Sequence, residues 1–498
     1  MHTSLLIELA AEICPDRIAV GSQQDGLSFA SLCNRAKIVA HWLLETGVHH
    51  AIQLGLNSIA VPLLIFGSGM AGLPFVPINY RLSDDDLQKL IGRMAPAIVI
   101  VDDDMAERIS SIIGVEVMLR SAFDQLFVTS PETVAETVPE TDNDVAVLLF
   151  TSGTTGEPKA AVLRHANLTS YVMSTVELLG ADESESTLVS VPPYHIAGIS
   201  AVLTSVYAGR RIVYLPAFTP DTWVTTAALE RITNAMVVPT MLDRILNAME
   251  SSGESLPALR ALSYGGGRMP ESTIARALTA MPSVDFVNAY GLTETSSTIA
   301  LLGADDHRRA FMSEDPAVRH RLGSVGKPLP SIELEIRGED GELLGPDMPG
   351  EIYVRGEQVS GEYLQKASTL SDGWFATKDS GWLDKDGYLY VQGRLDDVIV
   401  RGGENISPGE IEDVLREHTA ILDVAVLGLP CEKWGEKVAA VIVCDEGTVD
   451  LEALSATVKA RLRSTKTPEL WFFRDELPYN ETGKLLRRVL KAELSASC

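Results

Sequence analysis

The stretch Leu148-Leu-Phe-Thr-Ser-Gly-Thr-Thr-Gly-Glu-Pro-Lys159 closes an apolar run that begins at Val145. Its second half consists almost entirely of Gly, Ser and Thr and ends in a Pro-Lys pair. This pattern predicts a buried strand that leads into a flexible, hydroxyl-rich loop. Gly153 and Gly156 let the backbone turn toward a ligand, and Lys159 adds a positive charge, so the loop suits phosphate oxygens. The spacing is not that of a Walker loop, and a plain surface turn stays open as the alternative.

Length and composition indicate a globular protein of several domains. A chain of 498 residues is too long for one core and predicts two or three domains. Hydrophobic residues make up 46% and charged residues 22%, which is ordinary for such proteins. The net charge of −27 argues against nucleic acid or an anionic membrane as a partner. Any nucleotide site must therefore be locally basic.

The cysteines and the N-terminus favour a cytoplasmic protein. The five cysteines are scattered without metal-ligand or paired spacing, so they are expected to be reduced thiols. The N-terminus is acidic rather than basic and is not a signal peptide. Residues 51–80 carry no charge, but prolines interrupt them. They predict a buried strand, helix and strand at 51–56, 58–70 and 75–78 rather than a membrane span.

The rest of the chain has the sequence pattern of an α/β protein. Short apolar runs alternate with amphipathic stretches, which predicts strands buried on both faces and joined by helices. These runs lie at 97–101, 145–150, 187–191, 211–215, 235–238 and 261–264. Between about 332 and 392 the pattern changes to strict alternation, at 333–337, 351–355 and 388–392, with Gly-rich turns. That part predicts a small antiparallel β subdomain.

A domain boundary is expected after Gly393-Arg-Leu-Asp-Asp397. The remaining residues predict helices at 406–418 and 451–464 and strands at 424–429 and 438–443. This length suffices for a separate α+β domain. The predicted organisation is a large N-terminal domain of layered α/β subdomains, residues 1–395, and a C-terminal domain, residues 396–498.

The segment Thr151-Ser-Gly-Thr-Thr-Gly-Glu-Pro-Lys159 resembles the signature loop of the adenylate-forming superfamily. That group includes acyl-CoA synthetases, peptide-synthetase adenylation domains and firefly-type luciferases. The resemblance extends over nearly the whole chain and implies that the C-terminal domain is a mobile lid. One departure is Ala160, where the family usually has Gly. The loop residues that would hold the β- and γ-phosphates of ATP are Thr151, Ser152, Gly153, Thr154, Thr155 and Lys159.

A second motif, Asn288-Ala-Tyr-Gly-Leu-Thr-Glu-Thr295, matches the family's Tyr-Gly-x-Thr-Glu element. Taken alone, these residues predict a strand end, a turn and a capped helix start. The resemblance implies that Glu294 binds Mg²⁺ on ATP, that Thr293 contacts the α-phosphate and that Tyr290 packs on adenine. A carboxylate suits a hard cation bound to phosphates. The neighbours assigned to the same nucleotide site are Asn288, Ala289 and Gly291.

Two further segments resemble the family's acyl pocket. Tyr264-Gly-Gly-Gly267 is a loose turn by itself, but in relatives Gly265, Gly266 and Gly267 lie beside adenine and the acyl group. Pro192-Pro-Tyr-His-Ile-Ala-Gly198 places His195 where relatives gate the pocket, although a histidine among apolar residues is more often a core residue. Amino-acid-activating relatives hold the ammonium group with an acidic residue. The segment Val237-Val-Pro-Thr-Met241 has none, which favours an acid without an α-amino group.

The remaining motifs lie around the domain boundary. Lys378-Asp-Ser-Gly-Trp-Leu-Asp384 is similar to the family's Thr-Gly-Asp element, with Lys378 as a departure. The resemblance implies that Asp379 accepts the ribose hydroxyls, that Arg394 pairs with phosphate and that Asp396 is the hinge. The alternative is that these Asp and Gly residues only form turns and bind no ligand.

Two motifs of the C-terminal domain complete the resemblance. Gly402 and Gly403 correspond to glycines beside the pantetheine tunnel, or form a simple β-turn. Leu477-Pro-Tyr-Asn-Glu-Thr-Gly-Lys-Leu-Leu-Arg487 resembles the catalytic-lysine motif, which makes Lys484 the residue that reaches the adenylation site. Outside this motif, such a lysine is normally a solvated charge.

Together these motifs imply an ATP-dependent acyl-CoA ligase with ATP, CoA and Mg²⁺ as cofactors and a small carboxylic acid as substrate. The acid attacks the α-phosphate to give acyl-AMP and pyrophosphate, and the CoA thiol then displaces AMP. Charge neutralisation and positioning are the main tasks of such a site. The residues expected to act in catalysis are Lys484, Glu294, His195 and Thr293. Two alternatives stay open: an acyl-AMP ligase that loads an acyl carrier protein, and a variant that performs only the thioester-forming step.

Overall fold

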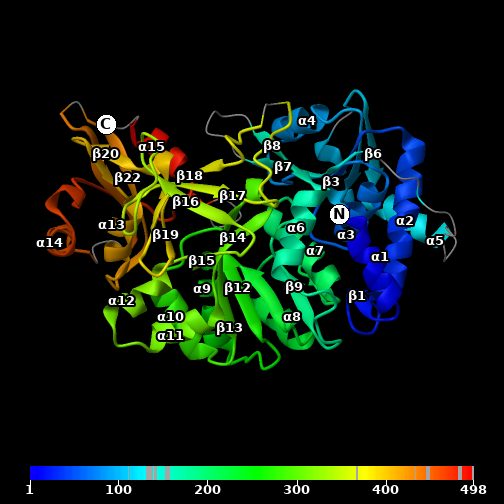
Figure 1. The fold of residues 1–498 in the computed structure, drawn as a ribbon, viewed down its shortest axis with the longest axis horizontal. Coiled ribbons are helices and arrows are strands. Elements are labelled where there is room, and N and C mark those ends of the chain that lie inside the picture. Colours follow the sequence, from blue (N-terminus) through cyan, green and yellow to red (C-terminus); the bar gives the residue numbers. More distant parts are fainter. Residues whose placement is uncertain are drawn as a thin grey trace.

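The computed structural model describes residues 1–109, 112–129, 138, 143–151, 158–365, 368–431, 433–444, 449–479 and 485–495. Figure 1 shows a large N-terminal part, coloured blue to yellow, and a smaller C-terminal part in orange and red. The predicted α/β class with a small C-terminal α+β domain is confirmed. In the described ranges, no helix combines the length and the apolar character needed to cross a membrane.

The first sheet has six strands in the order β6-β5-β3-β4-β7-β8. The predicted strand, helix and strand are β3 (His50–Leu54), α3 (Ala60–Met70) and β4 (Phe75–Pro77). Every residue of α3 is buried, which explains why this stretch carries no charge. The other members are parallel strands β5 (Ala97–Val101) and β6 (Val115–Leu119), and the antiparallel pair β7 (Val145–Thr151) and β8 (Lys159–Arg164).

The second sheet has nine strands in the order β15-β14-β13-β12-β11-β9-β10-β1-β2. Its parallel centre confirms four predicted apolar strands: β9 (Ser186–Val189), β10 (Arg211–Tyr214), β11 (Asn234–Val237) and β12 (Ala261–Gly265). The next strand, β13 (Asp285–Leu292), includes the strand end expected near Asn288. Its edges are β14 (Ser297–Leu302), β15 (Lys327–Pro328), β1 (Ile18–Val20) and β2 (Leu27–Ser28).

Helices cover both large sheets. One apolar core unites α1 (Ser4–Ile13), α2 (Phe29–Thr46), α3, α6 (His165–Thr175) and α7 (Ile196–Ala208) with strands of both sheets. A second core packs α8 (Pro220–Leu229), α9 (Pro239–Ser252) and α10 (Glu271–Ala280) on the nine-stranded sheet. The shorter peripheral helices are α4 (Asp84–Gly92), α5 (Arg120–Thr129), α11 (Ala304–Met312) and α12 (Pro316–Arg319).

The predicted antiparallel β subdomain is a four-stranded sheet in the order β16-β17-β18-β19. Its strands are β16 (Glu333–Arg337), β17 (Gly350–Arg355), β18 (Phe375–Leu383) and β19 (Leu389–Arg394). The alternating pattern had indicated three of them. The strand β18 is the one that sequence reasoning missed, and its ladder is irregular at two points.

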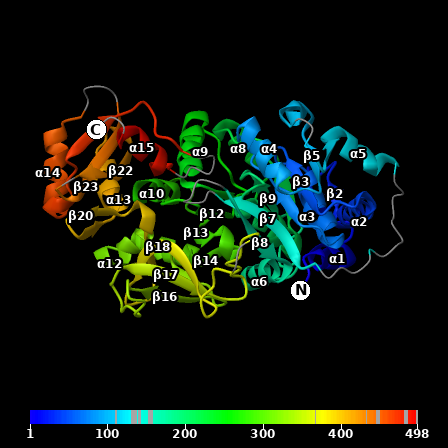
Figure 2. The ribbon, with the colours of Figure 1, turned by 90° about the horizontal axis from the view of Figure 1, so that it is seen from above.

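Within its described residues, the C-terminal domain has its own five-stranded sheet and three α-helices. The strands are β20 (Ile399–Arg401), β21 (Glu404–Ile406), β22 (Ile421–Cys431), β23 (Gly435–Cys444) and β24 (Leu470–Phe473). The helices are α13 (Pro408–Arg416), α14 (Leu451–Arg461) and α15 (Arg487–Ser495). Figure 2 shows this domain lying against the end of the N-terminal domain that carries α9 and α10.

A buried ion pair connects the last helix, α15, to the rest of the C-terminal domain. The guanidinium of Arg487 pairs with Glu412, whose side chain is almost fully buried. Glu412 also accepts a hydrogen bond from the Val426 amide at 2.8 Å, and Arg416 lies 3.6 Å away. Burial alone would raise the pKa of Glu412, but the charges of Arg487 and Arg416 lower it. Its stabilising contribution is therefore present above its ordinary pKa and is lost as the pH falls through the lowered value.

Replacing Arg487 by Met removes the closest cation from this carboxylate. Because an uncompensated buried charge is costly, we expect the free energy of unfolding to fall by about 3 kcal/mol. Urea unfolding at pH 7, followed by tryptophan fluorescence, measures this loss. The matched control is Arg474→Met, which breaks the exposed 2.8 Å pair with Glu493 and should cost less than about 1 kcal/mol. Equal losses for the two variants would contradict the argument.

Candidate active site

The β7–β8 hairpin carries the two ends of the predicted phosphate loop. Thr151 and Lys159 face each other in the ladder, and the Thr151 hydroxyl donates to the Lys159 carbonyl at 3.4 Å. The departure Ala160 is an ordinary, buried ladder residue opposite Phe150, so the strand accommodates its methyl group. The predicted loop residues Ser152, Gly153, Thr154 and Thr155 lie outside the described residues.

Glu294 lies in the short 3₁₀ turn Thr293–Thr295 that follows β13. Its side chain is buried, and its Oε1 accepts a hydrogen bond from the hydroxyl of Tyr363 at 2.6 Å. Burial, and then the charge of Glu294, raise the pKa of Tyr363, so the hydroxyl stays a donor. Tyr363 belongs to none of the motifs predicted from the sequence. The turn also explains Gly291, because a Cβ there would lie 1.7 Å from the Ser297 carbonyl oxygen.

A second buried carboxylate, Asp379, contacts two other residues predicted to bind the nucleotide. The hydroxyl of Tyr290 donates to Asp379 Oδ2 at 2.7 Å, and Arg394 Nη1 lies 3.3 Å from Oδ1. Burial, and then the charge of Asp379, raise the pKa of Tyr290, which keeps its proton. The structure therefore brings Tyr290, Asp379 and Arg394 together. Their expected contacts with adenine, ribose and phosphate stay predictions.

Lys378 occupies a position whose backbone conformation favours glycine. Its φ is +64°, in the left-handed region that side chains with a Cβ disfavour. Thr377 precedes it, and the Thr377 hydroxyl accepts a hydrogen bond from the Asp379 amide at 3.1 Å. The family's Thr-Gly-Asp element therefore aligns with Thr377-Lys378-Asp379, which restores the register around Asp379. The Lys378 ammonium pairs with Glu351 at 3.1 Å on the surface.

The structure explains two of the three consecutive glycines. A Cβ at Gly265 would lie 2.2 Å from the Ala289 carbonyl oxygen, so close packing of β12 on β13 requires glycine there. Gly266 has a φ of +78°. At Gly267 a Cβ would meet only Pro239, at 3.8 Å, so the fold itself tolerates a side chain. Asn288, beside Ala289, donates to the Ser324 carbonyl at 3.1 Å and has a structural role.

His195 precedes α7 and packs on Tyr194 with ring centroids 4.7 Å apart. Burial lowers its pKa to about 4, so the imidazole is neutral at pH 7. Its Nε2 is buried and makes no hydrogen bond within the described part of the chain. The unused nitrogen distinguishes this residue from a satisfied core histidine, and its gating role stays a prediction.

A cavity of about 330 Å³ is lined by Pro192 and Pro193, which precede His195 in the sequence, but not by His195 itself. Asn57 and Ser190 line it, and Asn57 Oδ1 and Ser190 Oγ are buried and without a hydrogen-bond partner among the described residues. None of its described lining residues is acidic, in agreement with the prediction of an acid without an ammonium group. Other lining residues are Tyr80, Arg81, Phe218, Val238, Met241, Arg244 and, from the C-terminal domain, Tyr479.

The structure describes only part of the C-terminal motifs. Lys484 is outside the described residues, but Tyr479 and Leu485, which flank it, form an antiparallel bridge. The turn at Gly402 and Gly403 joins β20 to β21, and the Gly402 amide donates to the Trp434 carbonyl at 2.7 Å. Both glycines have positive φ, which confirms the turn, whereas the pantetheine contact stays a prediction.

The described residues contain no cluster of three or more side chains that could bind a metal by themselves. Glu294 is a single buried carboxylate. This suits Mg²⁺, because that ion usually takes one or two protein carboxylates and completes its shell with phosphates and water.

Lys378→Gly provides a test of the backbone argument. The change relieves the left-handed strain, and we expect the free energy of unfolding to rise by about 0.5–1 kcal/mol. Lys378→Ala is the matched control, since it also loses the Glu351 pair but keeps a Cβ at the strained position, and it should bring no gain. Urea unfolding of both variants gives the comparison. A gain for Ala equal to that for Gly would contradict the role of φ.

Comparison with known proteins agrees with this arrangement. The AMP-binding enzyme family matches residues 7–364, and the AMP-binding enzyme C-terminal domain matches residues 410–484. The chain is 32% identical to feruloyl-CoA synthase of an Amycolatopsis species over 486 residues, which cover 96% of each protein. It is 31% identical to indoleacetate–CoA ligase of Aromatoleum aromaticum over 505 residues, covering 97% of this chain and 96% of that one.

A solved structure is similar over the same length. The o-succinylbenzoate CoA synthetase of Bacillus subtilis, in complex with its acyl-adenylate intermediate, has a TM-score of 0.83 and 30% identity, covering 98% of this chain and 97% of that one. The same protein has been solved with ATP and a magnesium ion. The resemblance drawn from the motifs is thereby confirmed: the chain belongs to the AMP-binding enzyme family, among its CoA ligases and synthetases.

Proposed function

We propose that the protein is an ATP-dependent, AMP-forming acyl-CoA ligase. The observation that carries this proposal is the pair of buried carboxylates, Glu294 and Asp379, each held by a tyrosine hydroxyl. In a family that binds AMP, such a pair supplies one anionic group for the cation on the phosphates and one acceptor for the ribose hydroxyls. Lys159, at the end of the loop hairpin, adds the positive charge that the phosphates require.

The substrate we propose is an aromatic carboxylic acid without an α-amino group. The relatives named above are a feruloyl-CoA synthase, an indoleacetate–CoA ligase and an o-succinylbenzoate CoA synthetase. The cavity of about 330 Å³ has a size suited to a small ligand, and Tyr80, Phe218 and Met241 provide apolar walls. The unpartnered oxygens of Asn57 and Ser190 suit a hydroxyl or similar polar substituent on the acyl group.

The chain's own groups would promote the first step by positioning and charge. Glu294 would hold Mg²⁺, which neutralises the phosphate charge when it is bound. Asp379 would accept the ribose hydroxyls, and Thr293 would contact the α-phosphate. Lys484 would stabilise the charge that develops as the carboxylate oxygen forms its bond to phosphorus and pyrophosphate leaves. His195, which is neutral, would border the acyl group without competing for its charge.

CoA is the acceptor we propose for the second step. Arg81 and Arg244 lie at the exposed side of the cavity and give local positive charge to a protein whose net charge of −27 repels anions at long range. Rotation of the C-terminal domain near Asp396 would bring the Gly402–Gly403 turn to the site. An acyl carrier protein is the alternative acceptor, and the experiment below distinguishes it.

Product analysis tests this function directly. Purified protein is incubated with Mg-ATP and a panel of aromatic, aliphatic and amino acids, with and without CoA, and the products are identified by mass spectrometry. We expect acyl-AMP from aromatic acids without CoA, and acyl-CoA with AMP when CoA is present. Acyl-AMP that persists in the presence of CoA would favour a carrier-protein acceptor. Thioester formed only from supplied acyl-AMP would overturn the ATP-dependent reaction.

The glycine segment gives a second test. Gly267→Ala leaves the fold intact because its Cβ has only ordinary contacts, so thermal unfolding should be unchanged. If adenine or the acyl group lies against this backbone, as proposed, the affinity for ATP or for the acid should fall about tenfold or more, a loss of about 1.4 kcal/mol. Gly265→Ala is the contrasting variant, since its Cβ meets the Ala289 carbonyl, and it should lower stability instead. Unchanged affinity of Gly267→Ala would contradict the placement.

A further inference from the structure

A short segment that no predicted motif included links the two charged parts of the site. Residues 360–364, here called the connecting segment, follow β17. At one end the amides of Ser360 and Gly361 donate to the Glu294 carbonyl at 2.9 and 3.3 Å. The Ser360 hydroxyl donates to the same oxygen at 3.1 Å. The backbone of this segment therefore fixes the turn that carries Glu294.

The other end of the connecting segment is paired to strand β8. The Leu364 amide donates to the Ala160 carbonyl at 2.9 Å, and the Val162 amide donates to the Glu362 carbonyl at 3.0 Å. Glu362 also accepts two hydrogen bonds from Arg164, both at 2.9 Å. Because β8 begins at Lys159, the same five residues hold both the hairpin of the phosphate loop and the Glu294 turn.

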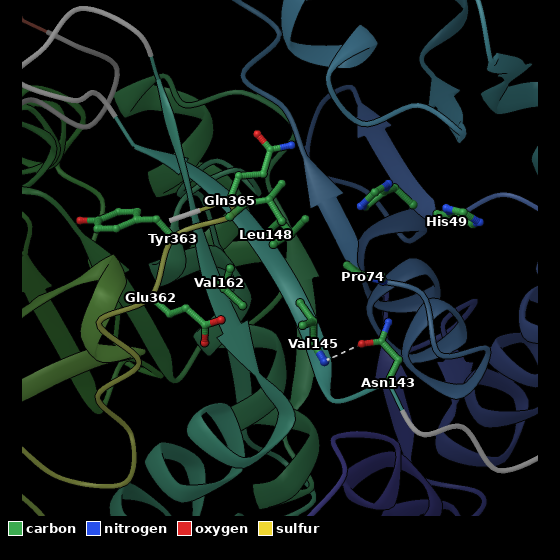
Figure 3. Close-up of a pocket in the computed structure, with 11 residues that line it drawn as sticks. His49, Pro74, Asn143, Val145, Leu148, Val162, Glu362, Tyr363 and Gln365 are labelled. Atoms are coloured by element: carbon green, nitrogen blue, oxygen red, sulfur yellow. Dashed lines mark hydrogen bonds between the residues drawn. The ribbon is translucent and has the colours of Figure 1, made fainter. Parts of the chain in front are cut away.

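Tyr363 is the side chain that touches both charges. Its hydroxyl donates to Glu294 Oε1 at 2.6 Å, and the Lys159 ammonium lies 5.9 Å from the centre of its ring, within range of a cation–π contact. Tyr363 is also one of the residues that line a cavity of about 380 Å³, and in Figure 3 its ring points away from His49 and Asn143 at the far side of that cavity. The hydroxyl of the tyrosine therefore contacts the Glu294 turn, while its ring lies within reach of Lys159.

The hydrogen bond to Oε1 has a definite consequence for cation binding. A carboxylate that can rotate offers either oxygen, whereas one that is bonded at Oε1 presents Oε2 in a fixed direction. Hydrogen-bond partners of metal-binding side chains typically change metal affinity or activity by about 10–100-fold when they are removed. The ring performs a separate task, because its face orients the Lys159 ammonium.

We infer that Tyr363 is a positioning residue for Mg-ATP, with its hydroxyl holding Glu294 for the cation and its ring holding Lys159 for the phosphates. This inference rests on the proposed function. Adenylation depends on Tyr363, whereas thioester formation from acyl-AMP, which needs neither the cation nor the β- and γ-phosphates, does not.

Two substitutions separate the two tasks. Tyr363→Phe keeps the ring and removes the hydroxyl, and Tyr363→Leu removes both. Calorimetry measures ATP affinity with Mg²⁺ and with a chelator, in the absence of acid. Mg²⁺ should increase ATP affinity by some factor in the wild-type protein, and for Tyr363→Phe we expect this factor to be at least about tenfold smaller. The affinity for ATP in the presence of chelator should be unchanged. For Tyr363→Leu we expect metal-free ATP affinity to fall as well.

The matched control is Tyr388→Phe. It removes a hydrogen bond of the same kind, from a tyrosine hydroxyl to Asp306 at 2.8 Å, outside the site, and should leave both affinities unchanged. Thioester formation from supplied acyl-AMP and CoA should stay at the wild-type rate in Tyr363→Phe, which also shows that this variant is folded. The inference would be overturned if Mg²⁺ increased the ATP affinity of Tyr363→Phe by the same factor as that of the wild-type protein. Failure of the wild-type protein to bind ATP would instead overturn the proposed function.

Discussion

The two buried carboxylates impose the strongest constraint on this structure. Glu294 and Asp379 are only 8% and 7% exposed, and an ionised carboxylate without hydrogen bonds costs several kcal/mol at such depth. Each is stabilised by a tyrosine from another element: Tyr363 from the connecting segment and Tyr290 from β13. The nine-stranded sheet and the β subdomain must therefore keep their relative position for either carboxylate to remain buried. The geometry of the site therefore depends on the packing of the N-terminal domain.

The contact between the two domains is of a different kind. The apolar clusters of the C-terminal domain contain no residue of the N-terminal domain. Across the boundary, Arg268 pairs with Asp413, and the Ser407 hydroxyl donates to the Gln392 carbonyl at 3.1 Å. A Cβ at Gly409 would lie 2.5 Å from Arg268 Nη1, so glycine lets α13 approach this arginine. Polar contacts exchange with water at little cost, which makes this interface compatible with the lid rotation that the family resemblance implies.

Sequence reasoning succeeded where the signal is local and failed where it is not. The apolar runs predicted the parallel strands because burial on both faces demands continuous hydrophobic residues, as in Ala97–Val101. Tyr363 was missed because its partner lies 69 residues away and no periodicity relates them. Gly265 was expected to admit a ligand, yet the Ala289 carbonyl opposite it is what excludes a side chain. For Lys378, only the backbone φ revealed that the family motif continues through it.

The residues assigned to the nucleotide already hydrogen-bond to one another, and this shapes how a ligand would bind. Asp379 accepts from Tyr290 on one oxygen and pairs with Arg394 on the other. A ribose hydroxyl that donates to Asp379 would share these oxygens, and a phosphate could bind the N–H groups of Arg394 other than the Nη1 group that pairs with Asp379. Binding at these residues would therefore add to or exchange existing hydrogen bonds rather than create a first partner for Asp379. Such an arrangement would keep Asp379 hydrogen-bonded throughout, so the acidic chain could admit an anionic nucleotide without exposing a bare buried charge.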